Sequence, residues 1–141
     1  GEPLRPLDSI ASGGELSRVM LAIKSVLADS DDVRSLVFDE IDTGVGGQVS
    51  VAMADHLSRL AGGKQVICIT HLATIAVRAD NHIVVEKSTS TDRTTVNTRV
   101  VQGPERESEI ARMLSGDTTA DVGVEHARAL LAKYRSDAWA K

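Results

Sequence analysis

Aromatic residues, cysteine and long apolar runs are scarce in this sequence of 141 residues. The aromatic side chains are Phe38, Tyr134 and Trp139, too few to build the stacking platforms that hold single-stranded nucleic acid. The formal net charge of −4 provides no basic face for duplex DNA. No apolar run is long enough to cross a membrane. The sequence therefore argues against a self-sufficient DNA-binding module and against a membrane-spanning segment.

The single cysteine, Cys68, lies inside an apolar run. We expect it to be a buried thiol, because a lone cysteine cannot form an internal disulfide and has no metal-ligand pattern around it. No signal-peptide pattern is present either. These features predict a reducing, cytoplasmic environment.

A phosphate-binding P-loop is also missing from the sequence. The motif G-x-x-x-x-G-K-[ST] is required after a strand. The nearest candidate, Gly63-Lys64, is followed by Gln65 and has Ser58 where the first glycine should stand. A nucleotide site built on this chain would therefore need its P-loop from another segment.

Hydrophobic periodicity predicts an α/β fold. The first predicted helix has one apolar stripe, formed by Leu16, Val19, Met20, Ile23, Val26 and Leu27. The further elements expected, in chain order, are a strand at 35–38, a helix over 49–60, a strand at 65–70, a short helix at 72–79, a hairpin of 82–87 with 94–101, and helices over 105–115 and 121–135. This order predicts a mostly parallel sheet core flanked by helices, followed by a β-hairpin and C-terminal helices.

The stretch "IASGGELSR" opens the first predicted helix. Ser12 and Glu15 have the spacing of a capping box, in which each side chain accepts from the other residue's backbone N–H. Gly13 and Gly14 are unexpected, because each glycine costs up to about 1 kcal/mol relative to alanine inside a helix. Two interpretations are open: a cap that tolerates glycine, or bare backbone that lets a phosphate approach the free N–H groups at the positive end of the helix dipole.

Ionisable residues follow both strands of the predicted parallel sheet. Asp39 and Glu40 come directly after "SLVF", and His71 follows "QVICIT". Ligands bind beyond the carboxyl ends of parallel strands. At such an edge one carboxylate suits hydrated Mg²⁺, the next can orient and deprotonate water, and a histidine can donate to a phosphate. Taken singly, the carboxylates also fit a solvated turn, and the histidine also fits a structural role.

The order and spelling of these segments are more specific than any one of them. "SGGELSR", "SLVFDE", "DTGVGG" and "ITH" follow one another and together resemble the second half of an ABC-type ATPase head. The segments "IASGGELSRVMLAIKSVL", "VFDEIDTGVGG", "ITHLATIAVRAD" and "RESEIARMLSGD" are similar to the C-terminal head segment of the RecN family of bacterial, SMC-like DNA-repair proteins. The resemblance covers residues 7 to 134.

The resemblance implies roles for individual residues. The segment that matches the signature motif, which in this family contacts the γ-phosphate of ATP bound to the opposite subunit, contains Ser12, Gly13, Gly14 and Glu15. Asp39 matches the Walker B aspartate that supports Mg²⁺, and Glu40 matches the adjacent catalytic glutamate. Asp42 matches the D-loop aspartate at the dimer seam. His71 matches the switch histidine.

The resemblance also implies cofactors and partners. ATP and Mg²⁺ are the expected cofactors. The expected partners are the P-loop half of the same head, a second head bound through ATP, and DNA reached through the full-length protein. Residues 1–141 are then one partial domain, inactive alone, of a cytoplasmic, nucleoid-associated ATPase in DNA double-strand-break repair and recombination.

Two alternatives remain at this stage. A transporter-type ABC domain usually continues "DEP" after Walker B and closes the D-loop with "LD", whereas this chain has "DEIDTGVGG". A non-catalytic head-docking module would not require Glu40.

Overall fold

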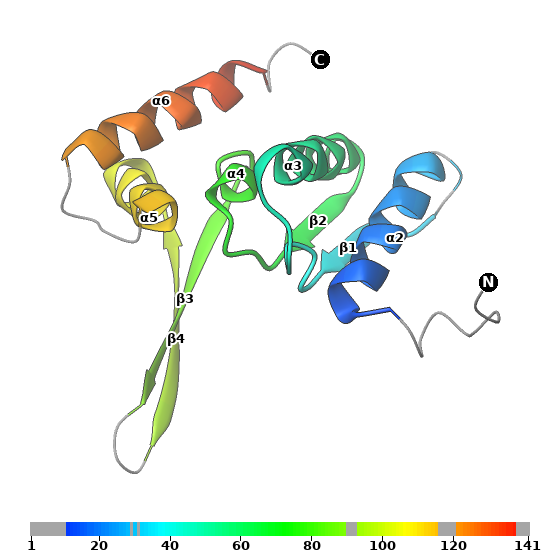
Figure 1. Cartoon of the computed structure of the whole chain (residues 1–141), viewed down its shortest axis with the longest axis horizontal. Helices are drawn as coiled ribbons and strands as arrows, with labels where there is room; N and C mark the ends of the chain where they lie inside the picture. Colours follow the sequence, from blue (N-terminus) through cyan, green and yellow to red (C-terminus); the bar gives the residue numbers. More distant parts are fainter. Residues whose placement is uncertain (1–10, 29, 31, 90–92, 116–120, 138–141) are drawn as a thin grey trace. The chain divides into compact units, whose positions relative to one another are not determined.

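The computed structural model describes residues 11–28, 30, 32–89, 93–115 and 121–137. The chain divides into two compact units, Gly1–Ile75 and Ala76–Lys141. The elements, labelled in Figure 1, are α2 (Gly13–Val26), β1 (Ser35–Phe38), α3 (Gly47–Ala61), β2 (Gln65–Cys68), α4 (Ala73–Ala76), β3 (His82–Thr89), β4 (Thr94–Val101), α5 (Gly103–Ser115) and α6 (Asp121–Asp137). The expected mixed α/β fold, with a parallel sheet, a hairpin and C-terminal helices, is confirmed.

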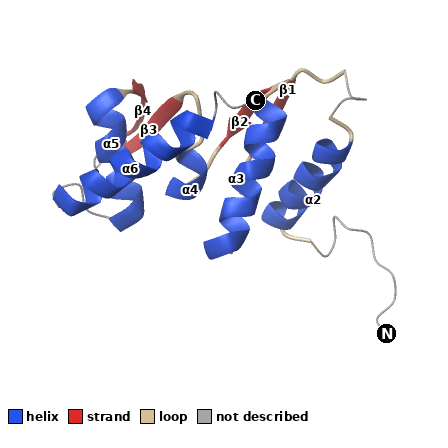
Figure 2. Ribbon diagram, turned by 90° about the horizontal axis from the view of Figure 1, so that it is seen from above, coloured by secondary structure: helices blue, strands red, loops and turns tan. Residues whose placement is uncertain are grey.

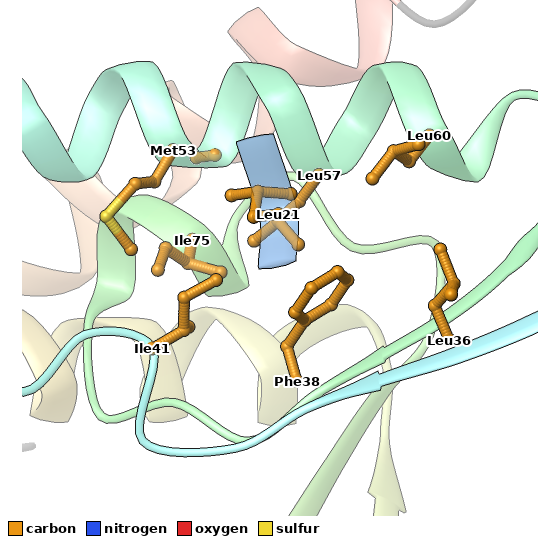
Figure 3. Close-up of a cluster of buried hydrophobic side chains, with 9 residues drawn as sticks. Leu21, Leu36, Phe38, Ile41, Met53, Leu57, Leu60 and Ile75 are labelled. Carbon is orange, nitrogen blue, oxygen red and sulfur yellow. The ribbon is translucent and has the colours of Figure 1, made fainter. Parts of the chain in front are cut away.

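The first unit is built on a two-stranded parallel sheet. β1 and β2 pair in register from Ser35 opposite Gln65 to Phe38 opposite Cys68. The side chains of alternate strand residues point to opposite faces, and one face packs against α3, as Figure 3 shows for Leu36 and Phe38. The core of this unit consists of Leu21, Leu36, Phe38, Ile41, Met53, Ala54, Leu57, Leu60 and Ile75.

The other face of this sheet has no cover within the described residues. Val37 is 64% exposed, and its register partner Ile67 is 48% exposed. Ile69, two residues beyond Ile67, is 56% exposed. A parallel sheet is normally covered on both faces, so this face lacks a layer.

The apolar stripe predicted for α2 does not serve as a core face in this chain. Its members are all exposed, from Leu16 at 37% to Val26 at 83%. The buried side chain of α2 is Leu21, which lies outside the predicted stripe. The helix is present as predicted and lies beside α3 (Figure 2), but its most apolar side faces away from the core.

Two predicted elements are shorter in the structure. β2 ends at Cys68 rather than at Thr70, because the backbone N–H of His71 and the hydroxyl of Thr70 donate to the Asp42 side chain. α4 covers Ala73–Ala76 rather than residues 72–79. Cys68 itself is half-buried, and burial together with the charges of Asp42 and Asp39 raises the pKa of its thiol to about 12.

The second unit consists of the β3–β4 hairpin with α5 and α6. The antiparallel register runs from His82 opposite Val101 to Thr89 opposite Thr94. Residues buried in this unit include Val77, Val84, Val101, Ile110, Ala111 and Ala127. The opposite face of the hairpin carries exposed apolar residues, Ile83, Val85, Val96 and Val100. Among the described helices, none has the length and apolarity that crossing a membrane requires.

Candidate functional site

The residues expected to carry chemistry gather at one edge of the β1–β2 sheet. Phe38 and Cys68 form the last paired rung of the two parallel strands. Beyond it, Ile69 N–H donates to the carbonyl of Phe38 at 2.9 Å. Asp39 and Glu40 therefore leave the sheet at the same edge as the segment that leads to His71.

The backbone at this edge is strained at one residue. Glu40 has φ +55°, a left-handed conformation that non-glycine residues rarely adopt. The Glu40 N–H donates to Oδ1 of Asp39 at 2.8 Å, and the Glu40 carbonyl accepts from Thr43 N–H at 3.1 Å. The side chains of Asp39 and Glu40 are both exposed. The turn thus presents two adjacent carboxylates to solvent.

The capping box predicted at the start of α2 is present. Ser12 N–H and Ser12 Oγ donate to Oε2 of Glu15 at 2.8 and 2.9 Å. Glu15 N–H donates to Ser12 Oγ at 3.3 Å. The hydrogen bonds from the Ser12 backbone and hydroxyl hold the pKa of Glu15 below its ordinary value. Ser12, Gly13 and Glu15 are exposed at the helix start, and Gly14 is buried.

The structure supplies a reason for Gly14 within this chain. A Cβ at Gly14 would lie 2.7 Å from the Glu40 carbonyl oxygen and 3.2 Å from Cβ of Thr43. Real Cβ atoms essentially never come that close to a backbone oxygen. At Gly13 the nearest atom, also at 2.7 Å, is Oε2 of the Glu40 side chain, which can rotate away. Gly14 is thus required by the close approach of α2 to the turn after β1.

Two polar residues hold the same contact, and the sequence reasoning missed both. Ser17 Oγ donates to the carbonyl of Asp39 at 2.8 Å. Arg18 Nη1 donates to the carbonyls of Ile41 and Thr43 at 3.1 and 3.0 Å. The only sequence signal is that Arg18 stands four residues after Gly14, on the same side of the helix.

Asp42 is buried, and its side chain joins the turn to the end of β2. Its carboxylate is 3% exposed, and Oδ2 accepts from Thr70 Oγ1 at 2.6 Å and from His71 N–H at 2.8 Å. The same oxygen lies 3.0 Å from Nδ1 of His71. Burial alone would raise the pKa of Asp42, but the donors Thr70 and His71 outweigh it, so the pKa lies below its ordinary value.

The site fits Mg²⁺ only as a partial coordination sphere. Within the described residues, no group of three or more histidine, cysteine or acidic side chains is gathered as a metal cluster. Mg²⁺ is usually held by one or two carboxylates together with waters and phosphate oxygens. The exposed carboxylate of Asp39 matches that requirement, since among the described residues its one hydrogen bond is from Glu40 N–H to Oδ1.

Comparison with known proteins identifies close sequence relatives. The chain is 54% identical to the DNA repair protein RecN of Treponema pallidum over 93% of this chain and 23% of that protein. It is 54% identical to RecN of Deinococcus radiodurans over 94% of this chain, and 47% identical to RecN of Bacillus subtilis over 93%, again with 23% of each relative covered. The chain therefore spans about a quarter of the length of the curated relatives that it matches.

No family model matches the chain. A solved structure described as "Structural biochemistry of ATP-driven dimerization and DNA stimulated activation of SMC ATPases" aligns with 70% of this chain and 60% of its own, with a TM-score of 0.45 and 21% sequence identity.

The close approach of α2 to the turn generates a paired prediction. Gly14→Ala places Cβ against a backbone carbonyl and is expected to destabilise the chain by about 1–3 kcal/mol, the range for overpacking. Gly13→Ala meets only a movable side chain and is expected to change stability by less than about 1 kcal/mol. Urea unfolding of both variants measures the difference. Equal losses would contradict the packing explanation for Gly14.

The Asp42 hydrogen bonds generate a prediction on pH. The pKa of Asp42 is lower in the folded chain than its ordinary value of 3.8, so its stabilisation is complete above that value and is lost as pH falls through the folded pKa. Asp42→Asn is expected to unfold more easily at neutral pH, by about 1–3 kcal/mol for the donors left without a carboxylate. Its stability is also expected to fall less on acidification. Urea unfolding at neutral and acidic pH tests both, and parallel pH profiles would contradict the assignment.

Proposed function

The chain belongs to the RecN family over the segment it spans, and we propose that it is the part of an ATPase head that supplies the signature motif, Walker B, D-loop and switch histidine. The observation that carries this proposal is the sheet edge. There, two exposed carboxylates and a largely exposed histidine follow neighbouring parallel strands. Two carboxylates, which can hold Mg²⁺ and activate water, and an imidazole, which can donate to a phosphate, thus follow the same sheet edge.

Each residue at this edge has a separate task in the proposal. Asp39 holds Mg²⁺ through its exposed carboxylate, in part through water. An ion held there would supply positive charge that offsets the negative charge developing on the phosphate. Glu40 orients the attacking water and takes its proton. His71 donates a hydrogen bond to the phosphate that is cleaved.

The start of α2 acts on a nucleotide held by a second head in the proposal. The segment of Ser12, Gly13 and Gly14 contacts the γ-phosphate of that nucleotide through its exposed residues Ser12 and Gly13 and, at the buried Gly14, through backbone alone, with Glu15 closing the cap beside them. The exposure of Ser12 and Gly13 at the N-terminus of α2, the positive end of the helix dipole, supports this role. The D-loop segment around Asp42 then lies at the seam between the heads, while the Asp42 carboxylate itself faces inward.

Uncovered apolar surfaces support the proposal that the P-loop half of the head comes from another segment. The outer face of the β1–β2 sheet and the stripe of α2 both expose large apolar side chains. Apolar surfaces of this kind mark interaction sites. We propose that the P-loop half covers them in the full head. We extend the proposal to the full-length protein, which would bind DNA, take part in the repair of double-strand breaks, and be cytoplasmic and nucleoid-associated.

The first experiment is a reconstitution. ATP turnover is measured for this chain alone, for the P-loop half alone, and for the mixture, with and without linear DNA. Turnover that appears only in the mixture supports a composite ATP site. Association of the two halves without any turnover would favour the second candidate, a head-docking module.

Glu40→Gln tests the general base. In the reconstituted head we expect turnover to fall by about 10² to 10⁴, the range for removal of a general base, while ATP-dependent pairing of heads is kept or strengthened. Glu125→Gln on α6 removes the same charge outside the proposed site and serves as the matched control. Turnover that is unchanged in Glu40→Gln would remove Glu40 from the catalytic role.

Ser12→Arg tests the contact made in trans. A long cation at the helix start fills the space for the phosphate, so we expect ATP-dependent pairing of heads to be lost. Loss of the cap costs stability by about 1 kcal/mol. Ser30→Arg adds the same charge at an exposed position after α2, and heads that carry it are expected to pair normally. Sizing of the heads with and without ATP makes the comparison, and normal pairing in Ser12→Arg would contradict the role.

A further inference from the structure

We propose that Asp42 is a positioning residue for His71: it fixes the imidazole by its Nδ1 edge and directs Nε2 away from the protein, toward the site. This role is additional to the position at the seam between heads that the D-loop match implies for Asp42. Its catalytic meaning rests on the proposed function, whereas its structural content, the orientation and protonation pattern of one ring, can be measured without any turnover.

The geometry starts from the shared oxygen. Oδ2 of Asp42 accepts hydrogen bonds from Thr70 Oγ1 at 2.6 Å and from the backbone N–H of His71 at 2.8 Å, and Nδ1 of His71 lies 3.0 Å from the same oxygen. Backbone and ring of His71 are therefore held by the same atom. Because side chains occupy a few staggered rotamers, a ring that keeps Nδ1 beside this oxygen while the backbone N–H donates to it is restricted in its orientation.

Burial separates the two ends of the interaction. The Asp42 side chain is 3% exposed, while the His71 side chain is 71% exposed. The carboxylate is therefore buried in the protein, and most of the ring is open to solvent beyond the Nδ1 edge that faces Asp42. Leu72 N–H donates to Thr70 Oγ1 at 3.0 Å, so the hydroxyl that supports Asp42 is itself fixed by the backbone.

The protonation pattern follows from the charge beside the ring. An ionised carboxylate oxygen lies 3.0 Å from Nδ1, so a proton on Nδ1 is attracted to it, whereas a lone pair on Nδ1 would be repelled. A neutral ring then presents the lone pair of Nε2 outward. His71 can donate from Nε2 to a phosphate oxygen only after Nε2 takes up a proton from solvent, and the resulting imidazolium lies between two anions, Asp42 and the phosphate. A buried carboxylate that fixes a tautomer and stabilises an imidazolium has the same physical role in serine hydrolases.

Nitrogen NMR of the 141-residue chain with ¹⁵N-labelled histidine tests the pattern directly. The spectra are recorded at about pH 8.5, well above the ordinary titration range of imidazole, and His71→Gln assigns the signals among the four histidines. We expect His71 to carry its proton on Nδ1, whereas imidazole free in water prefers Nε2–H. A His71 ring that is mainly Nε2–H would overturn the proposal.

Two variants separate the ring contact from general support of the turn. Asp42→Asn is expected to shift His71 toward Nε2–H, because a neutral amide no longer places a negative charge beside Nδ1. Thr70→Val removes another donor to the same oxygen and leaves Nδ1 of His71 in place, so the Nδ1–H form is expected to persist. Equal effects of the two variants on the tautomer would contradict a direct link. If Asp42→Asn does not fold, the unmodified chain and Thr70→Val still decide the question.

A kinetic cycle tests the catalytic meaning in the reconstituted head. Asp42→Asn is expected to lower kcat by about 10- to 100-fold, the range for carboxylates that orient metal-binding histidines, with KM changed little. In a head that already carries His71→Ala, adding Asp42→Asn should lower kcat hardly further, because the two residues act as a unit. If instead the two single-variant losses in kcat multiply in the double variant, Asp42 acts through the fold rather than through His71. A reconstituted head without turnover would count against the proposed function alone, and the tautomer would still be measured.

Discussion

The buried carboxylate of Asp42 is the constraint on which the geometry of the first unit depends. A single oxygen accepts hydrogen bonds from the side chain of Thr70 and the backbone of His71, and it lies 3.0 Å from Nδ1 of the His71 ring. Because Asp42 belongs to the turn after β1 and its donors follow β2, this oxygen joins the two strand ends beyond the last rung of the sheet. A two-stranded parallel sheet has few strand-to-strand hydrogen bonds to keep its ends together. The turn after β1 therefore contributes hydrogen bonds that neighbouring strands would contribute in a larger sheet.

The same turn is fixed from a second side by the start of α2. Arg18 donates to two carbonyls of the turn, Ser17 to a third, and Gly14 allows the backbones to touch. Two sequence motifs more than twenty residues apart are thereby locked into one structure. A shift at the helix start, such as one produced by a ligand there, would be transmitted directly to the backbone that carries Glu40. The left-handed φ of Glu40 is tolerated because both of its neighbours are held in this way.

Glycine at the helix start has two physical uses that do not compete. Gly14 is buried and lets α2 approach the turn, whereas Gly13 is exposed and faces only a movable carboxylate. In the proposed head, the exposed part of the first turn is available to a phosphate from a partner while the buried part keeps α2 seated. The uncovered apolar surfaces of α2 and of the outer sheet face have a different meaning, since they indicate protein surface to be covered rather than a ligand site.

Local patterns in the sequence were sufficient for the helices, the strands and the capping box. Periodicity predicts α2, α3 and the hairpin, and the spacing of Ser12 and Glu15 predicts the cap, because these features depend on residues a few positions apart. Adjacent parallel strands also predict that Asp39, Glu40 and His71 share a sheet edge. That shared position follows from the chain order of the elements alone.

Only the tertiary structure decided which surfaces are covered and which polar groups are joined. The stripe of α2 is apolar in sequence, yet it is exposed here, because burial depends on what lies against a helix and not on the helix itself. The links from Arg18 to the turn and from Asp42 to His71 join residues 23 to 29 positions apart. The sequence alone determined the chemistry available at this sheet edge, and folding decided the direction in which each group points, because distances across a turn and between strands arise only when the elements pack.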